Sequence, residues 1–144
     1  MNNITVKEAA SKVSIMQYTN YSEYLRSIHT YIKKERTKYS YYQFAEELGF
    51  SSSNVIWLVV DGRRKLTKMT TSRVISGLGL SGPARKYFTI LVKHNNTRSI
   101  DKRKTYLDQL IALKKKDLPS PEDKDKIKYF SEWFYPVLRE MIGL

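Results

Sequence analysis

Apolar residues recur every three or four positions along most of the chain, which is the spacing expected of amphipathic α-helices. The clearest stripe begins after Asn20, where Asn20 and Glu23 are spaced as a capping box, and it predicts a helix that ends near Lys38. Similar stripes and cap residues predict five further helices, within residues 40–49, 51–62, 67–78, 81–96 and 99–116. The pattern therefore predicts an all-α fold of six helices.

The chain is expected to contain four segments with different roles. Residues 1–14 are an N-terminal extension, residues 15–96 a helix-turn-helix domain on the signals described below, and residues 97–118 a candidate dimerisation helix. Residues 119–144 comprise a proline-containing linker and the start of an aromatic-rich C-terminal region. Within that tail, residues 129–133 are expected to be extended before a last helix begins at Pro136.

The chain is strongly basic, with 26 Lys and Arg residues against 14 Asp and Glu residues and a formal net charge of +12. Such an excess favours a polyanionic partner, in particular nucleic acid. The absence of cysteine from the sequence excludes disulfides, thiolate metal sites and cysteine nucleophiles. The N-terminus has no apolar run typical of a secretory signal, and no stretch approaches the ~18 apolar residues of a membrane span. We therefore expect a soluble cytoplasmic protein without a membrane partner.

Residues 40–65 combine the local signals of a helix-turn-helix. Ser40 and Gln43 form a second capping-box pair, and Gly49 stands where a left-handed residue ends a helix. Small polar residues then open a second helix, placed at about residues 52–61, and three cations follow it. Small side chains let the start of such a helix approach DNA, and the cations can contact phosphates. The DNA-binding residues expected on this basis are Ser52, Ser53, Asn54, Trp57, Arg63, Arg64, Lys65 and Tyr41.

The stretch FAEELGFSSSNVIWLVVDGRRKLT, with ISGLGL after it, resembles the helix-turn-helix of phage-repressor-type regulators. From about Ser14 to the C-terminus, the chain also resembles the Fibrobacter-type paralogous family of bacterial proteins, which is common in predatory bacteria as well. The motifs that carry this second resemblance are DGRR at 61–64, LGL at 78–80, YF at 87–88 and WFYP at 133–136.

The resemblance implies a DNA-binding transcriptional regulator. It also implies that the chain is the N-terminal part of a longer member, since members usually continue into a second helical domain. A regulator of this kind would bind double-stranded DNA as a homodimer, with half-sites about one helical turn apart.

The second helix of the predicted pair departs from both patterns, because it contains six consecutive apolar residues while base reading requires donors and acceptors. The family usually has a polar residue, often Lys, where this chain has Trp57. We expect Ile56 and Val59 to point inward, and the whole run cannot do so on one helix. Val55, Trp57 and Val60 are then an exposed apolar surface, with burial of Trp57 in the core as the competing interpretation. The alternative function is a protein-interaction adaptor that binds a protein partner through this surface.

The sequence carries no enzymatic signature, so we expect no catalytic residue, no cofactor and no metal. The Gly-x-Gly at residues 77–79 lies at a predicted helix end without a preceding strand, so it does not match a phosphate-binding loop. His29 and His94 are far apart in the sequence, and neither has a second metal ligand at a useful spacing.

Overall fold

The computed structural model describes residues 4–117, and within that range the chain forms seven α-helices, one 3-10 helix and no β-strand. The prediction of an all-α fold is therefore confirmed. The chain divides into two compact units, Met1–Asn96 and Thr97–Leu144. The linker, the segment at 129–133 and the helix expected from Pro136 lie outside the described residues.

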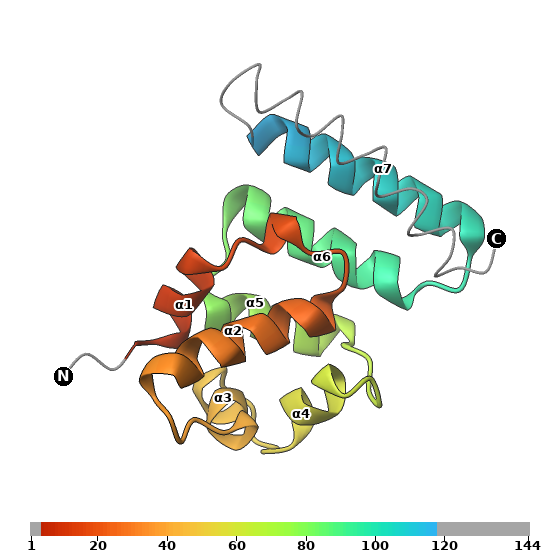
Figure 1. The fold of residues 1–144 in the computed structure, drawn as a ribbon. Coiled ribbons are helices and arrows are strands. Elements are labelled where there is room, and N and C mark those ends of the chain that lie inside the picture. The colour runs from red at the N-terminus through yellow and green to blue at the C-terminus, as the bar shows by residue number, and fades with distance from the viewer. Residues whose placement is uncertain (1–3, 118–144) are drawn as a thin grey trace. The chain divides into compact units, whose positions relative to one another are not determined.

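The first unit contains all but one of these elements (Figure 1). They are α1 (Val6–Lys12), η1 (Ile15–Gln17), α2 (Tyr21–Glu35), α3 (Tyr41–Glu47), α4 (Val55–Val60), α5 (Lys68–Leu78) and α6 (Gly82–Asn96). The helix α7 (Ile100–Asp117) belongs to the second unit, where the Ser99 hydroxyl accepts a hydrogen bond of 3.2 Å from the Lys102 amide. No helix of residues 4–117 is both long and apolar enough to cross a membrane.

The helix α1 was not among the six predicted helices. Thr5 caps it, since its hydroxyl accepts a 3.1 Å hydrogen bond from the Glu8 amide, and Ala9 is completely buried. A seven-residue helix is too short to be stable by itself, and α1 packs on both α2 and α5. Tertiary contacts that the local sequence does not reveal therefore support this helix.

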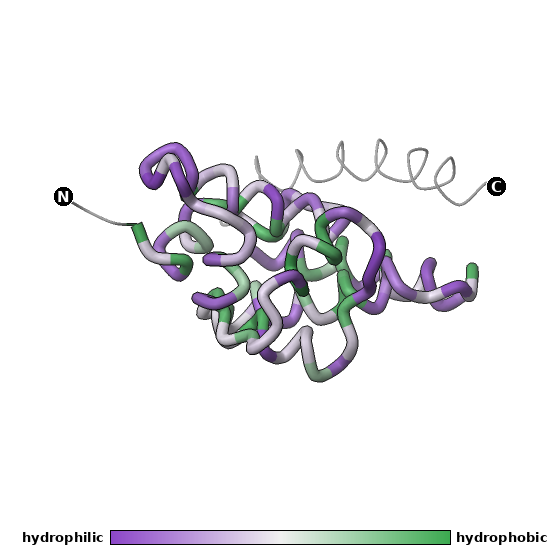
Figure 2. Tube along the Cα trace, turned by 90° about the horizontal axis from the view of Figure 1, so that it is seen from below, coloured by the Kyte–Doolittle hydropathy of each residue, from purple (hydrophilic) through white to green (hydrophobic). Residues whose placement is uncertain are grey.

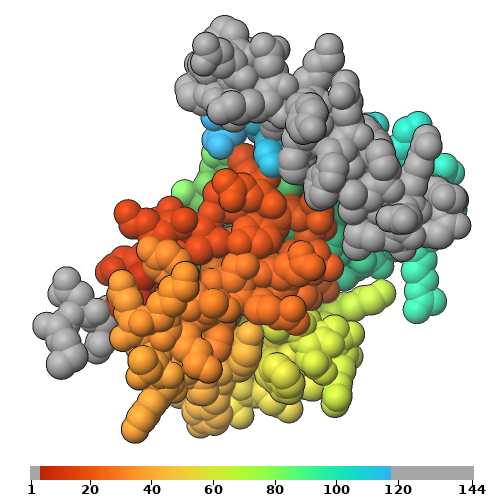
Figure 3. All heavy atoms as spheres, in the orientation of Figure 1, coloured from red at the N-terminus to blue at the C-terminus, as the bar shows by residue number. Residues whose placement is uncertain are grey.

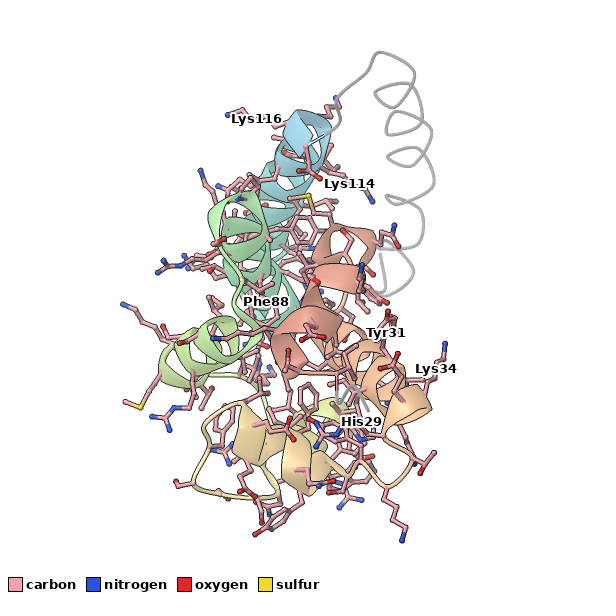
Figure 4. The ribbon with its side chains drawn as sticks, turned by 90° about the vertical axis from the view of Figure 1, so that its left-hand side faces the viewer. His29, Tyr31, Lys34, Phe88, Lys114 and Lys116 are labelled. Atoms are coloured by element: carbon pink, nitrogen blue, oxygen red, sulfur yellow. The ribbon has the colours of Figure 1, made fainter. Side chains whose placement is uncertain are left out.

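The helix α2 is the centre of the first unit, because α1, α4 and α6 all pack on it. The apolar stripe that predicted this helix faces inward: Tyr24, Leu25, Ile28 and Ile32 are completely buried, and Tyr31 is partly exposed. Within this unit, α6 lies on one side of α2, while α3 and α4 lie on the other (Figures 1 and 4). Seen from the side of α3 and α4, hydrophobic and hydrophilic residues alternate along the chain, as in amphipathic helices (Figure 2).

The end of α2 was predicted near Lys38 but is at Glu35. Arg36 leaves the helical conformation, with φ −116° and ψ 79°, and its guanidinium bonds both carboxylate oxygens of Glu47 at 3.0 and 3.2 Å. The same guanidinium lies 4.5 Å from the centre of the Tyr39 ring. These contacts turn the chain back toward α3 earlier than the helical periodicity suggested.

Polar contacts join the end of α6 to the start of α2 and to the loop before α5. The Tyr21 hydroxyl donates to the Asn96 side-chain oxygen at 2.8 Å and accepts from the Leu66 amide at 3.2 Å. The Asn96 side-chain amide donates to the Leu66 carbonyl oxygen at 2.9 Å. Leu66, the residue after the three cations, is therefore fixed through both of its backbone polar groups.

Replacing Gly77 by alanine tests the close packing of α5 on the end of α3. A Cβ atom at Gly77 would lie 2.7 Å from Cδ2 and 2.9 Å from Cα of Leu48. Although alanine is favoured over glycine inside a helix by up to about 1 kcal/mol, the contact with the Leu48 backbone should reverse the sign. We expect Gly77→Ala to lower the free energy of unfolding by about 1–3 kcal/mol in urea titrations. Ser76→Ala, at the exposed neighbouring position, should change it by less than about 0.5 kcal/mol. A more stable Gly77→Ala protein would contradict the packing.

Candidate nucleic-acid interface

The helices α3 and α4 pack on each other, and residues 51–54 of the segment that joins them are exposed. The predicted capping box is present at the start of α3: the Gln43 amide donates to the Ser40 hydroxyl at 3.1 Å, and the Ser40 amide donates to the Gln43 side chain at 3.2 Å. Gly49 ends this helix with φ +91°, as predicted, and the Phe50 amide bonds the Ala45 carbonyl at 3.0 Å. The capping box at the start of α3 and the left-handed glycine at its end are therefore confirmed.

The helix α4 is shorter than the predicted recognition helix at 52–61, because it extends only from Val55 to Val60. Ser52, Ser53 and Asn54 lie in the turn before it, and all three are exposed. The Ser52 hydroxyl donates to the Asn54 side-chain oxygen at 2.9 Å, and Asn54 has a non-helical backbone. Short polar side chains that bond one another locally compete with helix formation, which explains the late start. We call residues 51–54 the polar turn.

Four of the six side chains of α4 are buried, among them Ile56 and Val59, as predicted. Val55 and Val60 are each only 4% exposed, so the expectation that they form an exposed surface with Trp57 was wrong. The reason is that both α2 and α3 pack on α4, so more than one stripe of the helix is covered. Trp57 is 46% exposed, and its burial in the core is thereby contradicted.

The C-terminal end of α4 is held by α2. The Ser22 hydroxyl donates to the Val59 carbonyl at 2.9 Å, and the Arg26 guanidinium donates to the Val60 carbonyl at 3.2 Å. Gly62 adopts φ +81°, and the Arg63 amide reaches back to the Leu58 carbonyl at 3.0 Å. The carbonyl groups at the helix end are therefore satisfied, and the direction of the following chain is fixed.

The three cations after this turn, Arg63, Arg64 and Lys65, are all exposed and are called the basic triplet below. Arg63 forms an ion pair with Asp61, with 2.6 Å between its Nε and a carboxylate oxygen, although its side chain remains 74% exposed. An ion pair this exposed contributes about 0–1 kcal/mol, so a phosphate group can replace the carboxylate.

The net charge is concentrated in the first part of the sequence. Residues 1–96 carry 15 Lys and Arg residues against six Asp and Glu residues, a net charge of +9. Residues 97–144 carry 11 Lys and Arg residues against eight Asp and Glu residues, a net charge of +3.

An aromatic column connects the core to the exposed face of α4. The ring centres of Trp57 and Tyr41 are 5.5 Å apart, and those of Tyr41 and His29 are 3.8 Å apart with nearly parallel planes. His29 is a buried side chain of α2 (Figure 4), and its Nε2 lies 3.1 Å from the Tyr39 carbonyl oxygen. Burial raises the pKa of the Tyr41 hydroxyl above its usual value, although the positive charge of Arg26 and a hydrogen bond with it partly oppose this shift.

The structure brings the expected site residues together around α4. The polar turn precedes the helix, Trp57 lies on its exposed side with half-buried Tyr41 beside it, and the basic triplet follows it. In the space-filling view, α3 and α4 form the lower side of the first unit (Figure 3). Sequence reasoning missed the contributions of Arg26 and His29; the signal for His29 was its place one turn after Leu25 on the buried stripe of α2.

Comparison with known protein families, with curated proteins and with solved structures finds no match to this chain. Within residues 4–117, no three His, Cys, Asp or Glu side chains gather in a way that could hold a metal ion.

The buried position of His29 predicts a pH dependence of stability. Burial lowers the pKa of His29, Lys33 lowers it further, and the hydrogen bond with Tyr39 opposes both effects. Because the unfolded chain has a histidine pKa of about 6.5, it binds protons before the folded protein does as the pH falls. We expect the free energy of unfolding to decrease as the pH falls below about 6.5. In urea titrations between about pH 5 and pH 8, the His29→Phe protein should have a lower free energy of unfolding at neutral pH. Its free energy of unfolding should also depend less on pH than that of the wild-type protein. An equal slope in both proteins would contradict the assignment to His29.

Proposed function

We propose that this chain is a DNA-binding transcriptional regulator in which α3, the polar turn and α4 act as a helix-turn-helix. The observation that carries the proposal is the arrangement around α4: one face is buried against α2 and α3, while an exposed polar turn and an exposed basic triplet flank the helix. In such a unit, the second helix enters the major groove and the flanking segments contact phosphates.

The charge distribution supports the same proposal. Most of the net positive charge belongs to residues 1–96, and these residues also contain the α3–α4 pair. Cations that neutralise phosphates supply most of the sequence-independent affinity for DNA. The basic triplet is well placed for this role because Gly62 and Leu66 fix the chain on both sides of it.

The regulator would act as a cytoplasmic homodimer. One helix-turn-helix reads a half-site, and dimers of such proteins read two half-sites about one helical turn apart. The resemblance of the sequence to bacterial helix-turn-helix proteins points the same way.

The alternative function is a protein-interaction adaptor on the same scaffold. The exposed rings of Trp57 and Tyr42, 46% and 58% accessible, favour it. Burial of Val55 and Val60 weighs against it, because these residues were to complete the apolar surface. Interfaces usually rely on clustered, fully desolvated anchors, and an isolated Trp57 between polar segments is a poorer candidate.

Removal of the two arginines of the basic triplet tests the DNA-binding proposal. We expect Arg63→Ala/Arg64→Ala to weaken binding to mixed-sequence duplex DNA and to make the salt dependence of log K shallower by about two, one for each lost phosphate contact. Fluorescence anisotropy across a range of salt concentrations measures both quantities.

The matched control is Arg85→Ala/Lys86→Ala, which removes the same charge from exposed positions on α6. This helix lies on the other side of α2 from α4 (Figure 1). Only a smaller, non-specific loss is expected for the control. The proposal would be contradicted if the two double variants lost the same DNA affinity, or if the wild-type protein did not bind duplex DNA at low salt.

Trp57→Asp separates the two candidate functions. The side chain is half-exposed, so we expect the free energy of unfolding to change by no more than about 1 kcal/mol. A DNA-binding protein should lose duplex affinity, because the substitution brings a negative charge to the face that would contact a polyanion. Its sedimentation coefficient should stay the same. A loss of self-association with unchanged DNA affinity would instead support the adaptor.

A further inference from the structure

The body of α4 has very little with which to form hydrogen bonds to DNA bases. Its sequence is VIWLVV, and apart from half-buried Leu58 only Trp57 is outside the core. The indole N–H of Trp57 is therefore the one side-chain hydrogen-bonding group that α4 itself possesses. Polar base contacts must come from the polar turn, and the helix can offer only an aromatic, mostly apolar surface.

That surface is held in place by the aromatic column. Trp57 contacts Tyr41, Tyr41 stacks on His29, and His29 bonds the Tyr39 carbonyl within the core. The stacked pair is close, with 3.8 Å between ring centres and 9° between ring planes. An aromatic ring that is already ordered loses less conformational entropy when a ligand contacts it.

Base pairs differ in whether they have an apolar group in the major groove. Thymine presents its C5-methyl group there, whereas cytosine, adenine and guanine present mainly donors and acceptors. An indole ring placed against a polar base edge would remove more water-mediated hydrogen bonds than its single N–H can replace, which is unfavourable. Placed against a methyl group, the same ring buries apolar surface on both sides.

We propose that Trp57 selects thymine at one position of the bound DNA through its C5-methyl group, with Tyr41 and His29 as positioning residues. The inference rests on the proposed function, because it requires α4 to lie in the major groove. The polar turn directly precedes α4, and Asn54 is three residues before Trp57, so the two would face neighbouring base pairs, which are spaced about 3.4 Å apart. The basic triplet supplies affinity that does not depend on sequence.

The test uses duplexes selected by the wild-type protein from a random library. In one such duplex, each thymine is replaced in turn by deoxyuridine, which removes only the methyl group, and the Kd is measured by anisotropy. We expect one thymine position at which the replacement weakens binding about fourfold, the ratio given by burial of a single methyl group. Cytosine at that position should bind weakly, and 5-methylcytosine should recover part of the loss.

The variants assign this methyl effect to Trp57. Trp57→Gln should bind the thymine and deoxyuridine duplexes equally, whereas Trp57→Phe, which keeps an apolar ring, should retain part of the difference. Tyr41→Ala should reduce the ratio between the affinities for the thymine and deoxyuridine duplexes, because Trp57 loses the ring that orders it. Met69→Ala is the control, since Met69 is an exposed apolar side chain on another helix, 74% accessible, and the fourfold effect should persist.

The outcomes distinguish the two proposals. Absence of duplex binding by the wild-type protein at low salt overturns the proposed function and this inference together. Binding that is insensitive to deoxyuridine at every position overturns the inference alone, and so does a methyl effect that survives in Trp57→Gln. Circular dichroism of each variant verifies that the fold is retained.

Discussion

The packing of α4 between α2 and α3 is the constraint on which the candidate interface depends. A helix of six residues cannot persist in water by itself, so its conformation comes from contacts with its neighbours. Two side chains of α2, Ser22 and Arg26, bind the carbonyl groups at its end. Since so much of α4 faces inward, a ligand can meet only Trp57, half-buried Leu58, and the segments before and after the helix.

Much of the fold could be predicted because its helices and turns follow from patterns of residues that are close together in the sequence. The stripe of α2, the capping box at Ser40 and the left-handed stop at Gly49 are local features, and all three are present. The errors arose where distant contacts decide the outcome. The pair of Arg36 and Glu47 ends α2 early, and packing on α2 and α5 supports α1. Neither contact has a signature in the nearby sequence.

In the candidate site, the exposure of the polar and basic segments could be predicted better than the packing of α4 between them. The exposed positions of the polar turn and the basic triplet match the expectation. The burial of Val55 and Val60 could not be deduced, because the stripe rule assumes that one side of a helix is covered, and α4 is covered by two helices. The aromatic column could not be predicted either, because it joins residues from three separate helices. Only the fold brings Trp57, Tyr41 and His29 together.

The ion pair between Asp61 and Arg63 gives the basic triplet an internal competitor. An anion that binds Arg63 through Nε competes with a carboxylate that lies only two residues away in the chain and is therefore at high local concentration. A single weakly held anion has little advantage over that carboxylate. A polymer that presents several phosphates at once does, because neighbouring cations share the attachment. Because an ion pair this exposed contributes about 0–1 kcal/mol, the competition is weak, and it would favour a chain of phosphates over a single small anion only modestly.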